Sequence, residues 1–158
     1  MAAKPYFPVF IDLSDTAVLV VGAGRIALRR VRTLLDFAGS ICVVAPEVCP
    51  ELEALADAGA LTLYRRAFAP EDLKGMGMVL AATNDAALNR QVAELCRARG
   101  IPVNVGSDKT LCDFYFPGVA RRGSIVAGVT ASGTDHAAAK AVTAAVRALL
   151  EQEDADER

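Results

Sequence analysis

The sequence predicts an α/β fold, a Rossmann-like doubly wound parallel sheet followed by a small β-hairpin and a helix. Two observations lead to this prediction. Short β-branched runs alternate with longer helical patterns up to residue 106, and the first of these runs continues directly into a glycine turn, VVGAGRIA, at residues 20–27. Strands that alternate with helices imply parallel pairing through right-handed crossovers.

Five strands and three helices are expected in this first part. The apolar runs predict strands at 17–21, 41–45, 61–64, 78–82 and 102–105, and the first, second and fourth are apolar enough to be buried on both faces. Helical patterns lie between them, at 25–38, 49–58 and 86–99. In the last helix one apolar stripe is expected to face the sheet, formed by Leu88, Val92, Leu95 and Cys96.

The pattern changes after residue 106. The segments FYFPGV (114–119) and SIVAGVT (124–130) predict a hairpin that the polar link ARRG (120–123) closes. An alanine-rich amphipathic helix is expected over 137–151, with its polar side carrying Lys140, Thr143 and Arg147. Its apolar side carries Ala141, Val142, Ala145, Val146, Leu149 and Leu150. The charged end EQEDADER is expected to be a frayed tail. We therefore predict a dinucleotide-binding domain over 1–106 and a small extension over 107–158, for the substrate site and dimerisation.

The composition excludes several classes of protein. A chain of 158 residues with 53% hydrophobic residues and a net charge of −2 is typical of a globular domain, and its charge does not suggest a nucleic-acid binder. Because no apolar run is long enough for a signal peptide or a membrane span, we expect a cytoplasmic protein with no membrane partner. The four cysteines include no C-x-x-C pair and there is one histidine, so no metal site is expected and the thiols are interpreted as reduced.

The glycine turn predicts a dinucleotide cofactor. Gly22, Gly24 and Ala27 fit G-x-G-x-x-[G/A] directly after a buried strand and at the start of a helix. The first glycine allows a tight turn, the second lets the backbone reach a pyrophosphate, and Ala27 permits close helix–strand packing. The helix N-terminus then faces the phosphates with free N–H groups. The alternative is a turn that serves packing alone.

The end of the second predicted strand lacks the acid that usually binds the adenosine ribose. The chain has VVAPE there, so Glu47 or the backbone of Ala45 and Pro46 must serve. No arginine follows this strand, although Arg25 remains a possible ligand for a 2′-phosphate. We therefore expect NAD rather than NADP.

A second cofactor contact is expected after the fourth strand, in the segment AATNDAALN at 81–89. Thr83 and Asn84 offer a hydroxyl and an amide at the carboxyl end of the sheet, where ligands bind in open α/β folds. An N-cap formed by Asn84 or Asp85 is the alternative interpretation, and both can hold at once.

Over about residues 6–151 the chain resembles the precorrin-2 dehydrogenase / sirohydrochlorin ferrochelatase family, which occurs alone or as the N-terminal region of sirohaem synthases. The resemblance depends on an ordered set of segments rather than on a single motif. These are YFPVFIDL, VLVVGAGRIALRRVRTLL, VVAPE, AATNDAALN, NVGSDKTLCDFYFPG and TASGTDH.

The resemblance implies an NAD-dependent oxidation of precorrin-2 to sirohydrochlorin, in which a hydride leaves the tetrapyrrole for the nicotinamide. Some family members also insert iron. The family's cofactor contacts carry over to Gly22, Gly24, Arg25, Ile26, Pro46, Glu47 and Thr83.

Three positions depart from the family pattern. The family has an aspartate in an N-V-V-D stretch, but here NVGSD places Ser107 at that position and Asp108 one residue later. Asp108 is the candidate catalytic carboxylate only if the loop is rearranged, because neighbouring residues of an extended segment point to opposite faces. Metal insertion therefore becomes doubtful. In the loop TASGTDH, Ala131 and His136 replace a serine and a proline of the family.

Substrate contacts are expected from the second half of the chain. A substrate with eight carboxylates needs cations, for which Lys109, Arg121 and Arg122 are candidates, with ordinary solvated charges as the alternative. Ser132 and His136 belong to a loop that could line the substrate site, and a surface or capping role is the alternative for His136. A homodimer is expected through the hairpin and the last helix, with less surface than in family members that continue beyond this length.

Three functions follow from these interpretations. The first is a dehydrogenase without chelatase activity, and the second is a bifunctional enzyme in which Asp108 is essential for metal insertion. The third is a non-catalytic NAD-sensing domain, which the segment DFYFPG at 113–118 and the following loop and helix disfavour.

Overall fold

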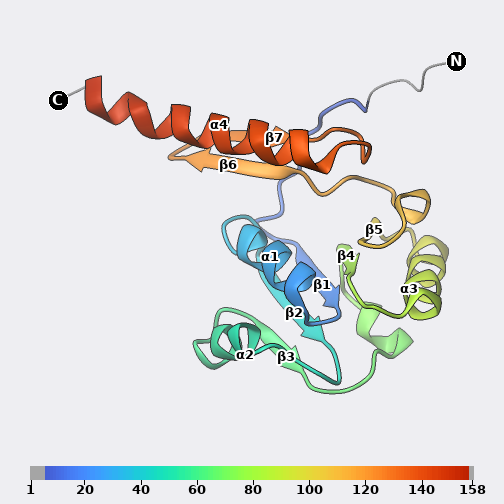
Figure 1. The fold of residues 1–158 in the computed structure, drawn as a ribbon. Coiled ribbons are helices and arrows are strands. Elements are labelled where there is room, and N and C mark those ends of the chain that lie inside the picture. Colours follow the sequence, from blue (N-terminus) through green and yellow to red (C-terminus); the bar gives the residue numbers. More distant parts are fainter. Residues whose placement is uncertain (1–5, 157–158) are drawn as a thin grey trace, which may run out of the picture. The chain divides into compact units, whose positions relative to one another are not determined.

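The computed structural model describes residues 6–156, and their side chains through residue 152. Its contacts divide the chain into two compact units (Figure 1). One unit is formed by Ile11–Phe114, and the other joins the segment up to Phe10 with the chain from Tyr115 onward. The functional division between residues 106 and 107 stays a prediction.

The first unit contains a parallel sheet of five strands in the order β3-β2-β1-β4-β5. The strands are β1 (Ala17–Val21), β2 (Ser40–Val44), β3 (Thr62–Tyr64), β4 (Met78–Ala81) and β5 (Val103–Val105). Every neighbouring pair is parallel. The strand order reverses between β1 and β4, which is the point where open α/β sheets bind their ligands. The predicted Rossmann-like fold is therefore confirmed.

Three helices connect these strands, as the sequence predicts: α1 (Arg25–Leu34), α2 (Pro50–Asp57) and α3 (Ala86–Ala98). Two short 3-10 turns, η1 (Pro70–Leu73) and η2 (Lys109–Leu111), were not expected. The helix predicted over 25–38 ends four residues early, because the amides of Phe37 and Ala38 both turn back to the carbonyl of Leu34.

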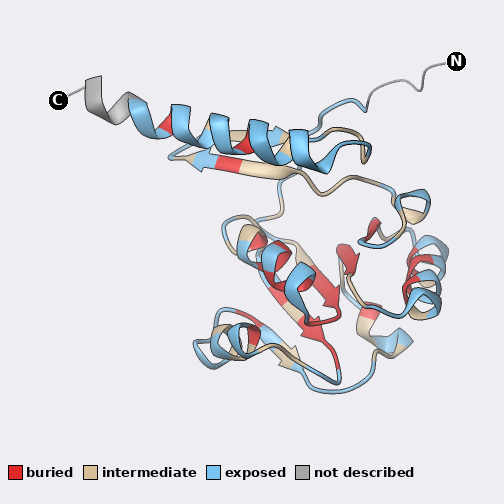
Figure 2. Ribbon diagram, in the orientation of Figure 1, coloured by how far each residue is buried: buried red, intermediate tan, exposed pale blue. Residues whose placement is uncertain are grey.

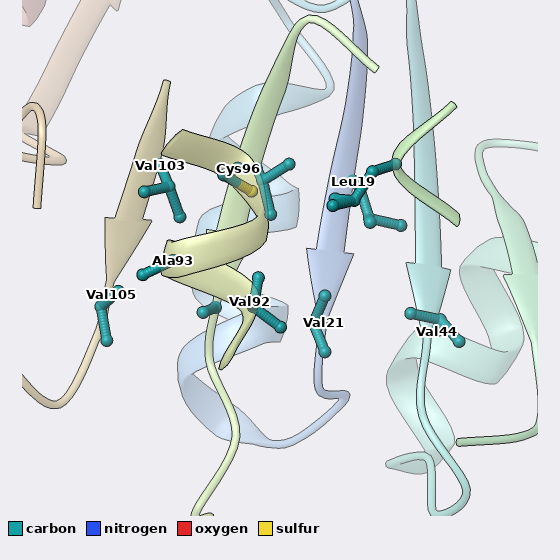
Figure 3. Close-up of a cluster of buried hydrophobic side chains, with 11 residues drawn as sticks. Leu19, Val21, Val44, Val92, Ala93, Cys96, Val103 and Val105 are labelled. Carbon is teal, nitrogen blue, oxygen red and sulfur yellow. The ribbon is translucent and has the colours of Figure 1, made fainter. Parts of the chain in front are cut away.

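The core of this unit lies on both faces of the sheet, because side chains alternate along each strand. Figure 3 shows the face that α3 covers, where Val92, Ala93 and Cys96 lie over strand side chains such as Leu19 and Val21. Burial concentrates on the strands and on the inner sides of the helices (Figure 2). The stripe predicted on α3 is only partly right, since Leu88 and Leu95 are half-buried at its margin.

The second unit is a two-stranded antiparallel sheet, β6 (Gly118–Arg122) and β7 (Ile125–Val129), together with helix α4 (His136–Asp156). The predicted hairpin is present. Its link is shorter than expected, because Arg122 pairs with Ile125 and leaves only Gly123 and Ser124 in the turn. Gly123 has a φ of +56°, which a two-residue hairpin turn requires.

The face that α4 turns to the hairpin agrees with the predicted apolar side only in part, since Leu150 is buried and Val146 half-buried while Val142 and Leu149 are exposed. Thr143, expected on the polar side, is buried, and its hydroxyl donates to the carbonyl of Ala139 at 2.7 Å. A Cβ at Gly118 would collide with the Thr143 side chain, so this glycine lets strand and helix approach closely. Arg147 donates to the carbonyl of Val119 at 2.9 Å, and Arg122 donates to that of Leu150.

Helix α4 also continues into the segment that was expected to fray. It extends to Asp156, and residues 157–158 lie outside the described part of the chain. The expectation of a frayed tail over 151–156 was wrong, because glutamate, glutamine and alanine are good helix formers even where no apolar residue anchors them.

Candidate functional site

The glycine turn between β1 and α1 is shaped by contact with the chain after β4. Gly22 has a φ of +105°, and a Cβ placed on it would lie 2.6 Å from the carbonyl oxygen of Ala82. Its amide donates to the carbonyl of Val44 at 2.9 Å. Only glycine therefore fits here, at the strand ends where the sheet order reverses.

Gly24 is different, because it faces open space. No atom lies within 4 Å of a Cβ placed on Gly24, and its φ of −92° is ordinary. Gly24 is the N-cap of α1, no side chain caps the helix, and its first turn carries no acidic residue. The first amide N–H groups of α1 therefore point outward, as a pyrophosphate requires. The turn fits a dinucleotide on these grounds.

The predicted contacts beside this turn lie at the same edge of the sheet. Ala27 is buried where α1 meets the sheet, whereas Ile26 is 44% exposed at the first turn of α1. Pro46 and Glu47 follow β2 and are exposed, and the amide of Cys49 donates to the carbonyl of Ala23 at 3.0 Å. This bond holds the loop after β2 against the glycine turn.

The outer side of α1 carries three exposed arginines. Arg25, Arg29 and Arg32 line a hollow of about 680 Å³ together with Glu51 of α2. Arg25 directly follows the glycine turn, and its role as a ligand for a 2′-phosphate stays a prediction.

The loop after β4 shows which residue caps α3. The Asp85 carboxylate accepts the amides of Ala87 at 2.9 Å and Leu88 at 3.1 Å, so Asp85 rather than Asn84 is the N-cap. Asn84 is exposed at the edge of the sheet and stays a predicted cofactor contact. The capping interpretation is confirmed for Asp85, and the cofactor contact stays a prediction.

The hydroxyl of Thr83 is occupied within the loop. It lies 2.7 Å from Oδ1 of Asn89 and accepts the amide of Asp85 at 3.1 Å. Asn89 is only 1% exposed, and its amide also reaches the Thr83 carbonyl and the Ser107 hydroxyl, both at 3.0 Å. Asn89 was not among the residues that the sequence pattern predicts for the site. The signal available was an amide at a position of α3 that faces the sheet.

The chain after β5 contains Ser107 and Asp108. Ser107 is exposed and joined to Asn89, whereas the Asp108 carboxylate caps η2. Its Oδ1 accepts from the amide of Thr110 at 2.9 Å and from the Thr110 hydroxyl at 2.6 Å. These two hydrogen bonds lower the pKa of Asp108. Lys109 follows and is exposed.

A buried cation lies beneath this edge of the sheet. Arg30 of α1 is 8% exposed, and a Cβ on Gly106 would lie 3.6 Å from its Nη2. Burial lowers the pKa of Arg30 to about 10, and the neighbouring charge of Arg29 acts in the same direction. Arg30 therefore stays charged at neutral pH and places a positive charge next to the end of β5.

The remaining predicted substrate residues belong to the second unit. Arg121 is on β6, Ser132 lies in the loop after β7 with a φ of +54°, and His136 is the exposed first residue of α4. The Ser132 amide lies 3.2 Å from the Thr130 hydroxyl. The structure thus brings the predicted cofactor residues together in one unit, and it places three of the substrate residues in the other.

Two further findings concern the described residues. They contain no group of three or more His, Cys, Asp or Glu side chains able to hold a metal ion. Among the helices of residues 6–156, none combines the length and the apolar character that a membrane span requires.

Comparisons with known proteins bear on the family and the fold of this chain. A family model described as "Putative NAD(P)-binding" matches residues 9–118. The siroheme synthase 1 of Cronobacter sakazakii is 39% identical over 145 residues, covering 92% of this chain and 31% of the relative. The siroheme synthase of Thioalkalivibrio sulfidiphilus is also 39% identical, with coverage of 92% and 30%. This chain therefore spans less than a third of these relatives.

A solved structure titled "SirC, precorrin-2 dehydrogenase" has a similar fold. The TM-score is 0.74 at 29% identity, and the match covers 90% of this chain and 70% of that one. These findings confirm the resemblance to the N-terminal region of sirohaem synthases. The family model described as "Putative NAD(P)-binding" covers most of the chain and includes the glycine turn. The chain therefore belongs to this NAD(P)-binding family.

Proposed function

We propose that this chain is an NAD-dependent dehydrogenase that oxidises precorrin-2 to sirohydrochlorin in sirohaem biosynthesis. The names of the siroheme synthases and of SirC support the substrate and the reaction. The observation that carries the proposal is the open, uncapped N-terminus of α1 at Gly24, because a nicotinamide dinucleotide needs this opening to lie across the sheet.

The cofactor-binding residues have separate tasks in this proposal. The backbone at Gly22, Gly24 and Arg25 receives the pyrophosphate, and Ile26 provides an apolar contact at the first turn of α1. Pro46 and Glu47 border the adenosine ribose. The loop at Thr83 and Asn84 borders the nicotinamide half through its backbone and the Asn84 amide, since the Thr83 hydroxyl is already bonded within the loop.

Bound NAD supplies a hydride acceptor at the carboxyl edge of the sheet. Oxidation of precorrin-2 removes one hydride and one proton, so NADH and H⁺ form with each sirohydrochlorin. Hydride loss leaves positive charge on the tetrapyrrole, which a nearby carboxylate stabilises. Asp108 is the proposed carboxylate. Its lowered pKa keeps it ionised at neutral pH, and its hydrogen bonds within the described residues all go to Oδ1, which leaves Oδ2 for the substrate.

NAD rather than NADP is the proposed cofactor. The Glu47 carboxylate is exposed beside the expected ribose position, where it repels a 2′-phosphate and accepts from a 2′-hydroxyl. Arg25 opposes this preference, because it is exposed and close to the turn. Glu47→Gln is therefore expected to improve the use of NADP relative to NAD.

We propose Lys109 as a contact for the substrate carboxylates in the first unit, and Arg121, Ser132 and His136 as contacts in the second unit. A tetrapyrrole with several carboxylates binds better where cations and hydrogen-bond donors surround it. Variants of Lys109 and Arg121 to methionine are expected to raise the KM for precorrin-2 while leaving the affinity for NADH unchanged.

Anaerobic incubation with precorrin-2 and NAD tests the proposed function. Sirohydrochlorin absorbance and NADH should rise together in a ratio of one to one. If NADH binds while neither product forms, the enzyme proposal fails and a nucleotide-sensing role gains support. Adding Fe²⁺ or Co²⁺ to sirohydrochlorin, with Asp108→Ala in parallel, separates the dehydrogenase from a bifunctional chelatase.

We also propose that the chain acts as a homodimer in the cytoplasm. Helix α4 leaves apolar side chains uncovered beside the face that packs on the hairpin, with Val142 49% and Leu149 59% exposed, and Ile125 of β7 is 51% exposed. A two-stranded hairpin with one helix buries little by itself, so a second copy would complete this core. Light scattering of wild type and of Val142→Asp/Leu149→Asp tests the dimer, which the variant should lose.

A further inference from the structure

The side-chain amide of Asn89 is fully engaged, and its orientation is fixed by backbone groups. Oδ1 accepts from the Thr83 amide at 3.3 Å, and Nδ2 donates to the Thr83 carbonyl at 3.0 Å. A backbone N–H can only donate and a backbone carbonyl can only accept. The amide therefore cannot be turned over, and Nδ2 is the atom that faces Ser107.

This orientation decides the role of the Ser107 hydroxyl. Nδ2 of Asn89 lies 3.0 Å from Ser107 Oγ and has no lone pair to offer, so the hydroxyl oxygen is the acceptor in that bond. The Ser107 proton must then point elsewhere. No side chain or carbonyl among residues 6–152 accepts it, and Ser107 is exposed where β5 ends.

We propose that Asn89 is a positioning residue that holds the Ser107 hydroxyl as a hydrogen-bond donor to an acceptor oxygen of the bound ligand. The acceptor is a carbonyl or carboxylate oxygen, either the carboxamide of the nicotinamide or a carboxylate of the tetrapyrrole. This inference rests on the proposed function. It assigns the Ser107 hydroxyl the role of a hydrogen-bond donor to the ligand. A carboxylate at the same position would instead accept a proton.

The network explains why this proton is available to a ligand. The same buried amide fixes the loop after β4 through Thr83 and the chain after β5 through Ser107, so both strand ends are held at one edge. Asn89 is 1% exposed, so water does not compete for its amide. A side chain held in this way loses little further freedom when the ligand binds.

Asn89→Asp reverses the polarity of the contact at nearly constant shape. A carboxylate at position 89 has no proton for Ser107, so the Ser107 hydroxyl turns inward and donates to it. The ligand then loses its donor although Ser107 is still present. Ser107→Ala removes the donor directly, and Ser107→Thr keeps it.

The test compares wild type with Ser107→Ala, Ser107→Thr, Asn89→Asp and the double variant Ser107→Ala/Asn89→Asp, in two assays. NADH affinity by fluorescence reports the cofactor carboxamide, and the KM for precorrin-2 reports a substrate carboxylate. We expect Ser107→Ala to raise either the dissociation constant of NADH or the KM for precorrin-2. The increase should be about three- to tenfold for a carbonyl acceptor and more than about tenfold for a carboxylate. Ser107→Thr should retain wild-type values.

The double variant separates positioning from general support of the fold. If Asn89 acts through Ser107, Asn89→Asp adds little in the Ser107→Ala background, whereas independent effects multiply. The inference is overturned if Ser107→Ala changes neither value while wild type turns over, or if the two changes multiply. If Asn89→Asp fails to fold, Ser107→Ala decides alone because its side chain is exposed. A wild-type chain that binds NADH without turnover overturns the proposed function, and this assignment with it.

Discussion

Substitution of Gly24 by alanine should separate cofactor binding from folding. The added methyl group meets no protein atom within 4 Å, and the backbone at Gly24 is one that alanine adopts freely. Alanine is a poorer N-cap than glycine, so the cost to stability is at most about 1 kcal/mol. The methyl group instead occupies the space in which the pyrophosphate approaches the α1 amides. We expect the NADH dissociation constant to rise at least about tenfold, which corresponds to about 1.4 kcal/mol.

The companion substitution Gly22→Ala should do the opposite and damage the fold. Its φ of +105° costs an L-residue about 1–2 kcal/mol. The Cβ would also lie 2.6 Å from the Ala82 oxygen, and forcing atoms apart in a packed region costs about 1–3 kcal/mol more. Gly100→Ala is the matched control, because Gly100 has a φ of +68° and open space around its Cβ. Gly100→Ala should lose only the stability that corresponds to the cost of a positive φ.

Urea unfolding and NADH fluorescence titration together read out this trio of variants. The expected order of stability is wild type and Gly24→Ala near the top, Gly100→Ala next and Gly22→Ala lowest. The expected order of NADH affinity places Gly24→Ala below Gly100→Ala. The reasoning is refuted if Gly24→Ala binds NADH like wild type, or if Gly22→Ala is no less stable than Gly100→Ala.

Three further predictions concern other parts of the chain. Gly118→Ala should destabilise the hairpin and α4 by about 1–3 kcal/mol, because the added Cβ collides with Thr143. Adding Thr143→Ala should restore part of the lost stability. Hydrogen exchange over residues 136–150 measures both effects. The hydrogen bonds from Arg66 lower the pKa of Asp72, so the ionised Asp72 carboxylate stabilises the fold above about pH 4. This stabilisation is lost as the pH falls further. The difference in unfolding free energy between wild type and Asp72→Asn should therefore shrink between about pH 7 and about pH 3. Arg25→Ala should lower kcat/KM for NADP about two- to fivefold more than for NAD, as suits one exposed charge pair, and equal effects would show that Arg25 does not discriminate.

The parallel sheet could be predicted because its signal is local. β1 and β4 consist of uninterrupted apolar residues that are buried on both faces, and no polar residue within them needed a partner from elsewhere. The glycine turn was also recognisable, because a strand that leads directly into a helix needs a tight turn. The positive φ of Gly22 in this turn is one that glycine adopts readily. Helix ends were less predictable. Phe37 and Ala38 continue the helical pattern, but their amides close a tight turn onto Leu34.

The polar network at the carboxyl edge was not predictable from the pattern. Asn89 is the first residue of the buried stripe of α3, and an asparagine in a helix is as typical of an exposed position as of a buried one. Its burial depends on partners at positions 83 and 107, which only the paired ends of β4 and β5 bring together. Hydrophobic periodicity does not take such hydrogen-bond partners into account. It therefore placed Leu88 and Leu95, rather than Asn89, on the buried side of α3.

Helix α4 shows how a correct pattern led to a partly wrong orientation. Periodicity identified an apolar stripe through Val142 and Leu149, and it assumed that this stripe would face the hairpin. In the structure Val142 and Leu149 are exposed, whereas Val146 is half-buried and Leu150 is buried. Thr143 faces the hairpin because Gly118 leaves room for a small side chain at the point of closest approach. A helix that leaves apolar side chains exposed beside its buried face offers a surface to which another chain can bind. The mismatch between pattern and packing is therefore the argument for a second copy. It also predicts that Val142→Asp/Leu149→Asp will dissociate the proposed dimer without unfolding α4 from its own hairpin.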